Sequence, residues 1–462
     1  MPQLPAAFQQ QMQHLLAADY PAFADALGTL PPVSIRLNGR KPAFDTAGLL
    51  PVPWCADGFY LPERPVFTLD PLFQAGAYYV QEASSMLLAE AIRQTVGARK
   101  PYTGQPHVRA LDLCAAPGGK TTLMASVLPL DSLLVCNEVI RSRVPILREN
   151  IDKWGYANVV VANHDPDDFA PLTGFFDLVM VDAPCSGEGL FRKDPRAVDE
   201  WSPDHVQLCS ARQKRILSAA APLVAERGWL IYSTCTYNDA ENLDNVRFLT
   251  QQGFENVPLA LPDDWGVVTR TTEGSVGYQC YPHQVRGEGF FISVFRKKLG
   301  GESAPISKGR GLKSARPVHH KQLGTLRTYL RDPDAFSYWQ KPNDELIAVP
   351  VALEKDLVLI DSALRNKGFG IAMGQFKGTD FLPDHALALS TELTPDLPGL
   401  DLDRDDALRY FKKENLTATN VPKGWLLARY QGLPLGWLKG LGNRVNNYLP
   451  KEWRIRMDIP EF

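Results

Sequence analysis

The sequence predicts an α/β protein whose central part is a doubly wound, Rossmann-like sheet of parallel strands. Two observations predict this fold class. Apolar runs suited to buried strands recur through the middle of the chain, and stretches with helical period separate them. Strands that alternate with helices are typical of a parallel sheet with helices on both faces. Because the chain has 462 residues, one hydrophobic core is not sufficient, and we expect further domains on both sides.

The central domain is expected at residues 101–298, and its elements follow from the apolar runs. The predicted strands are Val108–Leu113, Leu133–Cys136, Val159–Val161, Leu178–Val181 and Trp229–Tyr232. The helical patterns between them include Lys120–Leu128, Val144–Trp154 and Val206–Leu223. In such sheets, ligands bind beyond the carboxyl ends of the strands. The residues that follow each strand are therefore the candidates for function.

The regions on either side of this domain differ from it in composition. Residues 1–100 are rich in proline, with a strand predicted at Val33–Leu37 and a helix at Ala83–Val96, and we expect them to form an accessory domain. Residues 299–316 are rich in Gly, Ser and Lys, which is typical of a linker. Two small domains that mix short strands and helices are expected after it, at 317–383 and 384–462.

The overall composition is that of a soluble globular protein, with 45% hydrophobic and 22% charged residues. No apolar run approaches the roughly 18–20 residues that span a bilayer. The stretch Met1–Tyr20 has neither the basic nor the long apolar region of a signal peptide. We therefore expect a cytoplasmic protein without a membrane partner.

The seven cysteines are dispersed, at positions 55, 114, 136, 185, 209, 235 and 280. No CxxC pair is present, and the histidines make no ligand-like spacing with the cysteines, so no metal site is expected. An odd number of dispersed thiols also argues against a disulfide framework. Each cysteine near a strand end is therefore either a small apolar filler or a nucleophile.

The net charge of −3 hides a strong asymmetry along the chain. Arg296–Arg331 has ten Lys and Arg against one acid, Lys423–Arg456 has seven against one, and Pro383–Leu408 between them has seven acids and one base. Such runs are often solvated surface. Here they are interleaved with aromatic residues that offer stacking surfaces, which favours nucleic-acid binding. These aromatic residues are Tyr329, Trp425, Tyr430, Trp437 and Trp453.

A glycine-containing turn, "DLCAAPGGKTT", follows the first predicted strand of the central domain. Gly118 and Gly119 allow close approach of a ligand to the backbone, and a helix N-terminus follows them. The turn is not a P-loop, because the first glycine of that motif would fall at Cys114. It also lacks the G-x-G-x-x-G pattern of dinucleotide-binding proteins.

Acidic residues follow the second and third predicted strands. Glu138 lies at the end of the second strand, twenty residues after Gly118, where an acid can accept both ribose hydroxyls of a nucleoside. Asp165 follows the third strand, near the expected position of an adenine. Each acid alone is weak evidence. Together with the glycine turn they predict a cofactor that carries a nucleoside.

Two cysteines and an aspartate follow the fourth and fifth predicted strands. Asp182 and Cys185 come after the fourth strand, and Cys235 ends the apolar run of the fifth. If these strands are neighbours, both thiols face the same crevice. One crevice cysteine is more often a filler than a nucleophile. Two at adjacent strand ends, beside a carboxylate and a nucleoside cofactor, predict covalent catalysis.

The motifs "DLCAAPGGKT", "DAPCSGEG", "YSTCT" and "GEGFF" (Gly287–Phe291) resemble those of the Sun/Nop family of RNA cytosine-5 methyltransferases. The resemblance covers roughly residues 30–298. It implies a Rossmann-like domain dependent on S-adenosyl-L-methionine, with an N-terminal extension that binds RNA. The segment from Lys423 to Arg454 looks like the tail of the family's bacterial 16S rRNA branch, the RsmF/YebU type. This implies a small C-terminal α+β region, PUA-like and RNA-binding.

The resemblance also implies roles for single residues. Cys235 would be the nucleophile, Cys185 would assist release, and Asp182 would hold the cytosine and lie beside the cofactor. In DNA cytosine methyltransferases the nucleophile corresponds instead to Cys185. The cofactor's methionine portion would contact the turn, Glu138 its ribose and Asp165 its adenine, and Arg143 also fits the family pattern. The residues of that turn are Cys114, Ala115, Ala116, Pro117, Gly118, Gly119 and Lys120.

The implied partner is ribosomal RNA of the small subunit, 16S rRNA, either free or in the assembled 30S subunit, and we expect a monomer. Arg192 and Lys193 are candidates for phosphate contacts, with a solvated loop as the alternative. Two other functions compete with this interpretation. One is a non-catalytic ribosome-assembly factor that binds rRNA, and the other is a methyltransferase for tRNA or DNA. The presence of both thiols argues against the first, and Cys235 with the basic tail argues against DNA.

Overall fold

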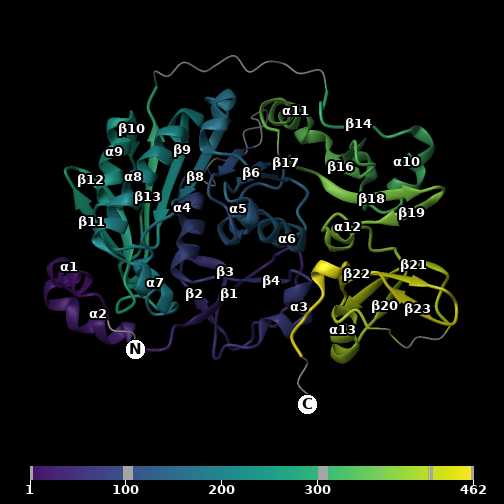
Figure 1. Cartoon of the computed structure of the whole chain (residues 1–462), viewed down its shortest axis with the longest axis horizontal. Coiled ribbons are helices and arrows are strands. Elements are labelled where there is room, and N and C mark those ends of the chain that lie inside the picture. Colours follow the sequence, from purple (N-terminus) through teal and green to yellow (C-terminus); the bar gives the residue numbers. More distant parts are fainter. Residues whose placement is uncertain are drawn as a thin grey trace.

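The computed structural model describes residues 4–96, 108–299, 311–365, 367–414, 416 and 420–458 (Figure 1). Within these ranges the chain forms a four-stranded sheet near the N-terminus, a ten-stranded central sheet, a five-stranded sheet and a C-terminal four-stranded sheet. The predicted α/β class is confirmed. No helix in the ranges given is both long and apolar enough to cross a membrane.

The N-terminal region begins with two helices, α1 (Ala6–Leu16) and α2 (Tyr20–Leu27). Its sheet has the order β2-β3-β1-β4 and is antiparallel where β1 pairs with β3 and β4. The strands are β1 (Val33–Leu37), β2 (Leu50–Val52), β3 (Cys55–Leu61) and β4 (Tyr78–Val80), with α3 (Pro71–Gln74) between β3 and β4. The predicted strand β1 is confirmed. The predicted helix at 83–96 is a 3-10 turn, Ser84–Leu87, followed by α4 (Leu88–Gln94).

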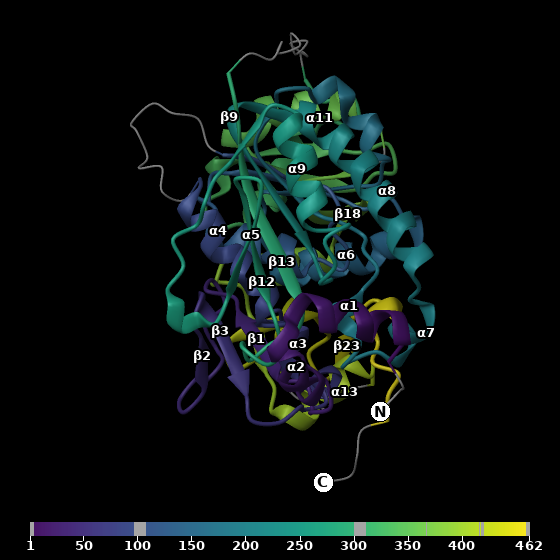
Figure 2. The same cartoon turned by 90° about the vertical axis from the view of Figure 1, so that its left-hand side faces the viewer.

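The two N-terminal helices pack on the central domain rather than on the sheet that follows them. Figure 2 shows α1 and α2 beneath the end of the central sheet. Phe8 and Phe23 are fully buried, and the ring of Phe23 lies 5.2 Å from that of Tyr237 in an edge-on contact. Tyr237 belongs to the loop that begins with Cys235. The N-terminal helices therefore support the loop that carries a candidate catalytic residue.

The core of the central sheet is parallel, in the order β9-β8-β5-β6-β7. Its strands are β5 (Arg109–Asp112), β6 (Leu133–Asn137), β7 (Val159–Ala162), β8 (Phe176–Asp182) and β9 (Val224–Thr234). The intervening helices include α5 (Gly119–Val127), α6 (Val144–Trp154), α7 (Pro195–Glu200) and α8 (Pro203–Ala220), and α9 (Leu243–Gln251) follows β9. All five predicted strands and the three predicted helices are confirmed. Asp182 pairs in register with Ser233, so the ends of β8 and β9 are neighbours as expected.

The central sheet extends beyond its parallel core at both edges. On one side β13 (Phe290–Lys297) lies antiparallel to β9 and is followed by β12 (Ser275–Cys280) and β11 (Val268–Thr272), while β10 (Phe254–Asn256) also pairs with β13. On the other side β17 (Lys367–Gly368) pairs with β7. The sequence analysis assigned none of these strands. A chain segment beyond residue 360 thus completes a sheet that begins near residue 109.

The five-stranded sheet follows after residue 311. Its order is β14-β15-β16-β18-β19, and the strands span Arg316–Pro317, Phe336–Gln340, Leu346–Pro350, Ile371–Lys377 and Asp380–Pro383, with α10 (His320–Arg327) and α11 (Glu354–Ala363). Residues 300–310 of the expected linker lie outside the described residues. At its described end, the backbone N–H groups of Lys313 and Ser314 donate to the Asp361 carboxylate on α11.

The C-terminal sheet has the order β20-β21-β22-β23. Its strands span Gly399–Asp401, Gly424–Tyr430, Leu433–Gly440 and Val445–Asn447, and α13 (Arg404–Phe411) covers one face. Helix α12 (His385–Leu389) contacts both β18 and β22 and so joins this sheet to the preceding one. Figure 1 places the β1–β4 sheet beside the C-terminal sheet, and Leu69 and Ala75 contribute to the core beneath that sheet.

The structure corrects the expectation of stacking surfaces at Tyr329 and Trp437, whereas Trp425, Tyr430 and Trp453 are partly exposed. Tyr329 and Trp437 are buried, 8% and 1% exposed, and their rings meet 5.8 Å apart. The indole N–H of Trp437 donates to the Asp384 carbonyl, and that of Trp425 to the Phe381 carbonyl. These side chains hold the two C-terminal sheets together. A lone sequence does not separate this role from base stacking, because both use large aromatic rings.

Candidate active site

A cavity of about 910 Å³ lies beyond the carboxyl ends of the parallel strands. Residues after β5, β6, β8 and β9 line it together, as a doubly wound sheet requires. Among the lining residues are most of the side chains singled out from the sequence. These are Cys114, Ala116, Glu138, Arg143, Asp182, Cys185 and Cys235.

The two candidate catalytic cysteines are in contact. Their Sγ atoms lie 3.1 Å apart, and the backbone N–H of Cys235 points at the Cys185 sulfur at 3.4 Å. The hydrogen bond with the Cys235 thiol and burial together raise the pKa of Cys185 well above its ordinary value. Cys185 is therefore held as a thiol, able to donate a hydrogen bond to its neighbour.

Asp182 is oriented by two donors at the end of β8. Its Oδ2 accepts a hydrogen bond from Lys120 Nζ at 2.8 Å, and its Oδ1 accepts one from Ser233 Oγ at 2.6 Å. Burial alone lowers the pKa of Lys120, but the Asp182 carboxylate outweighs burial and leaves that pKa above its ordinary value. The Lys120 ammonium also lies 5.2 Å from the centre of the Phe290 ring. Lys120 is thus a charged side chain directed at Asp182, and it does not line the 910 Å³ cavity.

The glycine turn after β5 packs closely against its neighbours, and Gly118 and Gly119 themselves do not line the cavity. Gly118 has φ of +112°, and a Cβ atom there would lie 3.2 Å from Leu147 Cδ1, so both the backbone and the space call for glycine. Helix α5 begins at Gly119. Cys114 and Ala116 line the cavity, whereas Pro117 faces a second cavity of about 440 Å³. Ala115 is fixed by its N–H bond to the Asn137 carbonyl.

Glu138 is held in place at the end of β6. Its Oε1 accepts the N–H of Ile140 at 2.8 Å, and its Oε2 lies 3.4 Å from an Arg143 nitrogen. Arg143 in turn donates to the Ala116 carbonyl at 2.6 Å. Arg143 therefore connects Glu138, the residue expected to bind the ribose, to the glycine turn. An oriented carboxylate, a close backbone and a cavity of this size fit a cofactor that carries a nucleoside.

Asp165 precedes Pro166, which lines the cavity, and its carboxylate is already paired. Its two carboxylate oxygens each lie 3.1 Å from the Arg215 guanidinium, which lowers the pKa of Asp165. Its side chain also caps the turn after β7 by accepting the N–H of Asp167. Pro166 and Arg215 line the cavity, whereas Asp165 itself does not.

Two buried glutamates, Glu188 and Glu241, connect the loops that carry the two cysteines. One Glu188 oxygen accepts hydrogen bonds from Thr236 Oγ1 and from the N–H groups of Tyr237 and Asn238. Neither acid was predicted from the sequence as a site residue. Neither differs in type from a loop-surface glutamate, and the only available signal was the place of Glu188 within the "DAPCSGEG" motif.

Glu241 makes the reciprocal contact from the loop after β9 to the loop after β8. Its carboxylate accepts the N–H of Ser186 at 2.9 Å and the side-chain amide of Gln213 at 2.7 Å. Burial raises the pKa of Glu241 above its ordinary value. The hydroxyls of Ser186 and Thr236 lie 3.1 Å apart between the two glutamates. The cysteine pair thus stands on a buried polar network that fixes one loop against the other.

Arg192 and Lys193, the candidates for phosphate contacts, have different surroundings. The Arg192 guanidinium donates to both Glu288 oxygens, at 3.0 and 3.2 Å, and the two side chains are 5% and 3% exposed. Arg192 is therefore a buried structural residue, which corrects the expectation of a phosphate contact. Lys193 is exposed, with its Nζ 3.9 Å from Glu288.

Three family models match parts of the chain. The model of the 16S rRNA methyltransferase RsmB/F matches residues 102–296, that of the N-terminal domain of 16S rRNA methyltransferase RsmF matches residues 4–83, and that of the methyltransferase RsmF PUA domain matches residues 398–455. Together they reach into the central domain and both flanking regions.

Relatives match over nearly the whole chain. A ribosomal RNA small subunit methyltransferase F from Vibrio cholerae serotype O1 is 32% identical over 430 residues, which cover 87% of this chain and 85% of that protein. The protein of the same name from Erwinia tasmaniensis is 30% identical over 476 residues, which cover 97% of this chain and 96% of that protein.

Solved structures match a little under two thirds of the chain. A methyltransferase homolog protein from Pyrococcus horikoshii is 26% identical with a TM-score of 0.53, covering 63% of this chain and 94% of that chain. NSun6 from Pyrococcus horikoshii with SFG is 19% identical, also with a TM-score of 0.53, covering 63% of this chain and 98% of that chain. The latter likeness concerns the fold alone. From these matches and the motifs above, the chain belongs to the RsmB/F family of 16S rRNA methyltransferases, in the branch with RsmF-type N-terminal and PUA domains.

Proposed function

We propose that this protein methylates C5 of a cytidine in 16S rRNA through a covalent bond between Cys235 and C6 of the base. The main support for this proposal is the pair of thiols, which lie 3.1 Å apart after the ends of β8 and β9, beside the Asp182 carboxylate. Family membership makes the chain an S-adenosyl-L-methionine-dependent methyltransferase, and the cavity with Glu138 and the glycine turn is suited to that cofactor.

The chemistry explains why a thiol is needed. When bound, the cofactor supplies an electrophilic methyl group on a sulfonium, but C5 of cytosine is too poor a nucleophile to take it. A Cys235 thiolate that adds to C6 moves the C5–C6 π electrons to C5 as the ring becomes an enamine. Covalent catalysis thereby replaces one difficult step by accessible ones. After C5 has taken the methyl group, a base accepts the C5 proton, the electrons of the C5–H bond restore the C5–C6 double bond, and the C6–S bond breaks to release the Cys235 thiolate.

The two cysteines then have separate roles. Cys185 is held as a thiol, so it is suited to donate its hydrogen bond to the departing Cys235 sulfur rather than to attack. One Asp182 oxygen accepts a hydrogen bond from Lys120 and the other from Ser233. The carboxylate oriented in this way is suited to bind the amino group and N3 of the cytosine. A charge-assisted pair such as Lys120–Asp182 fixes that carboxylate before the base arrives.

The cofactor contacts are proposed residue by residue. Glu138 binds the ribose hydroxyls, the turn at 114–119 holds the methionine portion, and Arg143 keeps these two together through its bonds to Glu138 and Ala116. Asp165 acts at the adenine end through the rim that it forms with Arg215. Lys120 orients Asp182 for the cytosine and does not bind the methionine portion of the cofactor.

We further propose that the chain consists of domains at 1–100, 101–298, 317–383 and 384–462, with a linker at 299–316. We also propose that the protein acts as a monomer in the cytoplasm and that its substrate is rRNA, either free or in the assembled 30S subunit. The separate sheets support this division, although β17 and α12 cross its boundaries by contact. A non-catalytic assembly factor is less consistent with the buried network that holds both thiols, because RNA binding alone needs neither.

Bisulfite sequencing tests the proposed reaction. Unmodified 16S rRNA and, separately, 30S subunits are incubated with the protein and S-adenosyl-L-methionine, and bisulfite then converts every cytidine that lacks a 5-methyl group. We expect one or more cytidines to resist conversion only when both protein and cofactor are present. Complete conversion of both substrates would contradict the proposal.

A further inference from the structure

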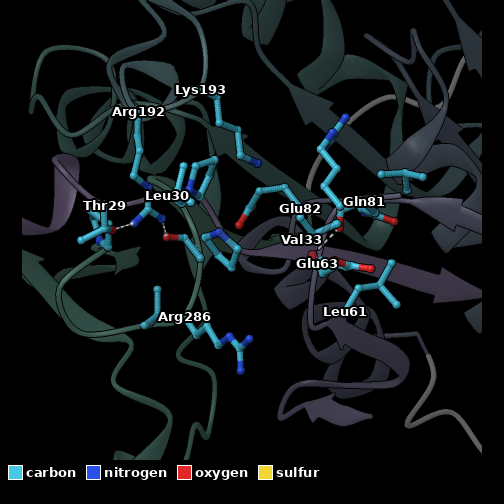
Figure 3. Close-up of a pocket in the computed structure, with 18 of the residues that line it drawn as sticks. Thr29, Leu30, Val33, Leu61, Glu63, Gln81, Glu82, Arg192, Lys193 and Arg286 are labelled. Carbon is cyan, nitrogen blue, oxygen red and sulfur yellow. Dashed lines mark hydrogen bonds between the residues drawn. The ribbon is translucent and has the colours of Figure 1, made fainter. Parts of the chain in front are cut away.

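A groove of about 1190 Å³ separates the N-terminal sheet from the central domain. Figure 3 shows Leu61, Glu63 and Gln81 on one side and Arg192, Lys193 and Arg286 on the other. Its volume exceeds the roughly 300–1,000 Å³ of pockets that enclose a small ligand. A groove of this size suits a length of polymer better than a small molecule.

The charges in this groove favour an anionic polymer. Arg64, Lys193 and Arg286 line it and are exposed. Arg64 and Arg286 rest on aromatic rings, with the Arg286 guanidinium 4.6 Å from the centre of the Tyr60 ring, and within the described ranges neither makes an ion pair. Such cations stay available to a ligand, and the Arg–ring contact keeps the guanidinium oriented.

The acids that border the groove are mostly committed to the protein. Glu288 is buried against Arg192. Glu82 accepts the backbone N–H groups of Ser84, Ser85 and Glu288, each at 2.8–2.9 Å. The exposed acid that remains on the lining is Glu63. The groove therefore presents Arg64 and Arg286, which make no ion pair within the described ranges, and the exposed Lys193, which lies 3.9 Å from the buried Glu288, against one exposed carboxylate.

Apolar residues border the groove beside these cations. Leu30 is 92% exposed and is followed by two prolines that also line the groove, and Leu61 and Pro62 lie on the sheet side. An exposed apolar lip beside cations can pack against unstacked bases while the cations take the phosphates. A paired helix would present its phosphates and shield its bases.

Residues that line the groove contact the loops that carry the two cysteines. Arg192 donates to the Gly287 carbonyl, and two residues later Gly289 packs so closely on Gly189 that a Cβ on either glycine would meet the other's backbone within 3.0 Å. The N–H of Gly189 donates to the Cys235 carbonyl at 2.8 Å. Two backbone segments, residues 287–289 and Gly189, thus connect the groove to Cys235.

We propose that this groove binds the unpaired RNA segment next to the target cytidine, with its phosphates on Lys193, Arg286 and Arg64 and its bases against Leu30 and Leu61. The inference rests on the proposed function and adds the position and the single-stranded state of the substrate. An enzyme that reacts at C6 of a base must take that base out of any stack. A neighbouring site for unpaired RNA keeps the segment open while this occurs.

Binding of short RNAs to the full chain tests the inference. Fluorescence anisotropy is measured with a ten-nucleotide single strand and with the corresponding duplex, between 50 and 200 mM salt. Wild type should prefer the single strand. The Lys193→Glu, Arg286→Glu double variant should bind it at least about 10-fold more weakly, with a log–log salt slope smaller by about 1.4, since two phosphate contacts are lost.

Arg196→Glu is the matched control, because Arg196 is 83% exposed, lies on α7 and does not line the groove. It should bind the single strand within about twofold of wild type, and both variants should bind S-adenosyl-L-methionine like wild type, which shows that they are folded. Leu30→Ser should weaken single-strand binding without changing the salt slope.

Three results would overturn the inference. They are an equal loss of affinity in Arg196→Glu, a preference for the duplex, and unchanged RNA affinity in the double variant, which would leave the groove to a protein partner. Its failure is distinguishable from failure of the proposed reaction. Wild type that protects cytidines from bisulfite while the double variant binds RNA normally refutes only the groove, whereas wild type that protects none refutes the reaction.

Discussion

Lys120 Nζ lies 2.8 Å from Asp182 Oδ2, across the gap between the first turn of α5 and the end of β8. The pair joins the glycine turn to the residue proposed to hold the cytosine. It also explains why a lysine in the first helical turn, where the helix dipole disfavours a positive charge, is retained as a charged group.

Replacing this lysine should affect the reaction more than cofactor binding. Lys120→Met leaves Asp182 without its charged partner, and we expect kcat for methyl transfer to fall by at least about 100-fold. The dissociation constant for S-adenosyl-L-methionine, measured by calorimetry, should change less than about threefold. Weakened cofactor binding with unchanged kcat would instead return Lys120 to the methionine portion of the cofactor.

Glu138 should determine cofactor affinity. Glu138→Ala removes the carboxylate proposed for the ribose hydroxyls, and the binding free energy should become less favourable by about 1–3 kcal/mol, because charge-assisted hydrogen bonds are lost. Glu226→Ala, at an exposed position on β9, serves as the control and should bind like wild type. Unchanged calorimetric affinity in Glu138→Ala would place the cofactor elsewhere.

Glu188 should couple the stability of the site to its activity. Glu188→Gln keeps the size of the side chain but replaces one acceptor oxygen by an amide that faces donors from Thr236, Tyr237 and Asn238. We expect the free energy of unfolding, measured in urea, to fall by about 1–3 kcal/mol. Methyl transfer should be lost at temperatures where the variant is still folded. A stable and fully active variant would show that the network does not position the cysteines.

Asp112 is fully buried at the end of β5, and its ionisation should make the free energy of unfolding depend on pH. Burial raises its pKa from 3.8 to about 7, against a hydrogen bond from Thr121. Because the folded state holds the proton more tightly than the unfolded state, this residue's contribution is fully present below pH 3.8 and is lost as the pH rises to about 7.

Asp112→Asn should remove that loss. Each pH unit well inside this window changes stability by about 1.4 kcal/mol, and the change levels off near pH 7, so between pH 5 and pH 7 the variant should gain about 2 kcal/mol relative to wild type. Urea unfolding of both proteins at the two pH values measures the difference. An identical pH dependence in the two proteins would mean that Asp112 is ionised in the folded state.

Local sequence signals predicted the central fold because they reflect local physics. Helix α6 begins and ends at the predicted residues, since Pro145 suits its first turn and Gly155, with φ of +83°, ends it. The meeting of Asp182, Cys185 and Cys235 also followed from the sequence, because neighbouring parallel strands end at one edge. The family resemblance then assigned roles that spacing alone left open.

The features that were not predicted depend on long-range packing. Strand β13 is buried, but its partner β9 lies some sixty residues earlier, and β17 joins β7 from about 200 residues away. Glu188 is a charged residue in a loop between Gly187 and Gly189, and it is buried only because its acceptor oxygens meet donors from the loop after β9. Arg192 is buried by its bonds to Glu288 and to the Gly287 carbonyl, whereas the adjacent Lys193 stays exposed, and no local pattern encodes this difference.

Cys235 and Cys185 have separate roles in the proposed reaction, attack and release. If Cys235 attacks C6, Cys235→Ala forms no adduct and loses methylation entirely. If Cys185 assists expulsion, Cys185→Ala still attacks and methylates but stalls as a protein–RNA adduct. Attack precedes release, so the double variant should resemble Cys235→Ala alone.

The most direct measurement is denaturing electrophoresis of each variant after incubation with 16S rRNA and S-adenosyl-L-methionine. We predict a slower band that RNase removes for Cys185→Ala, and no such band for Cys235→Ala or for the double variant. Cys209→Ala, which changes a buried thiol on α8, is the control and should resemble wild type. An adduct in Cys235→Ala that is absent from Cys185→Ala would contradict the account and make Cys185 the nucleophile.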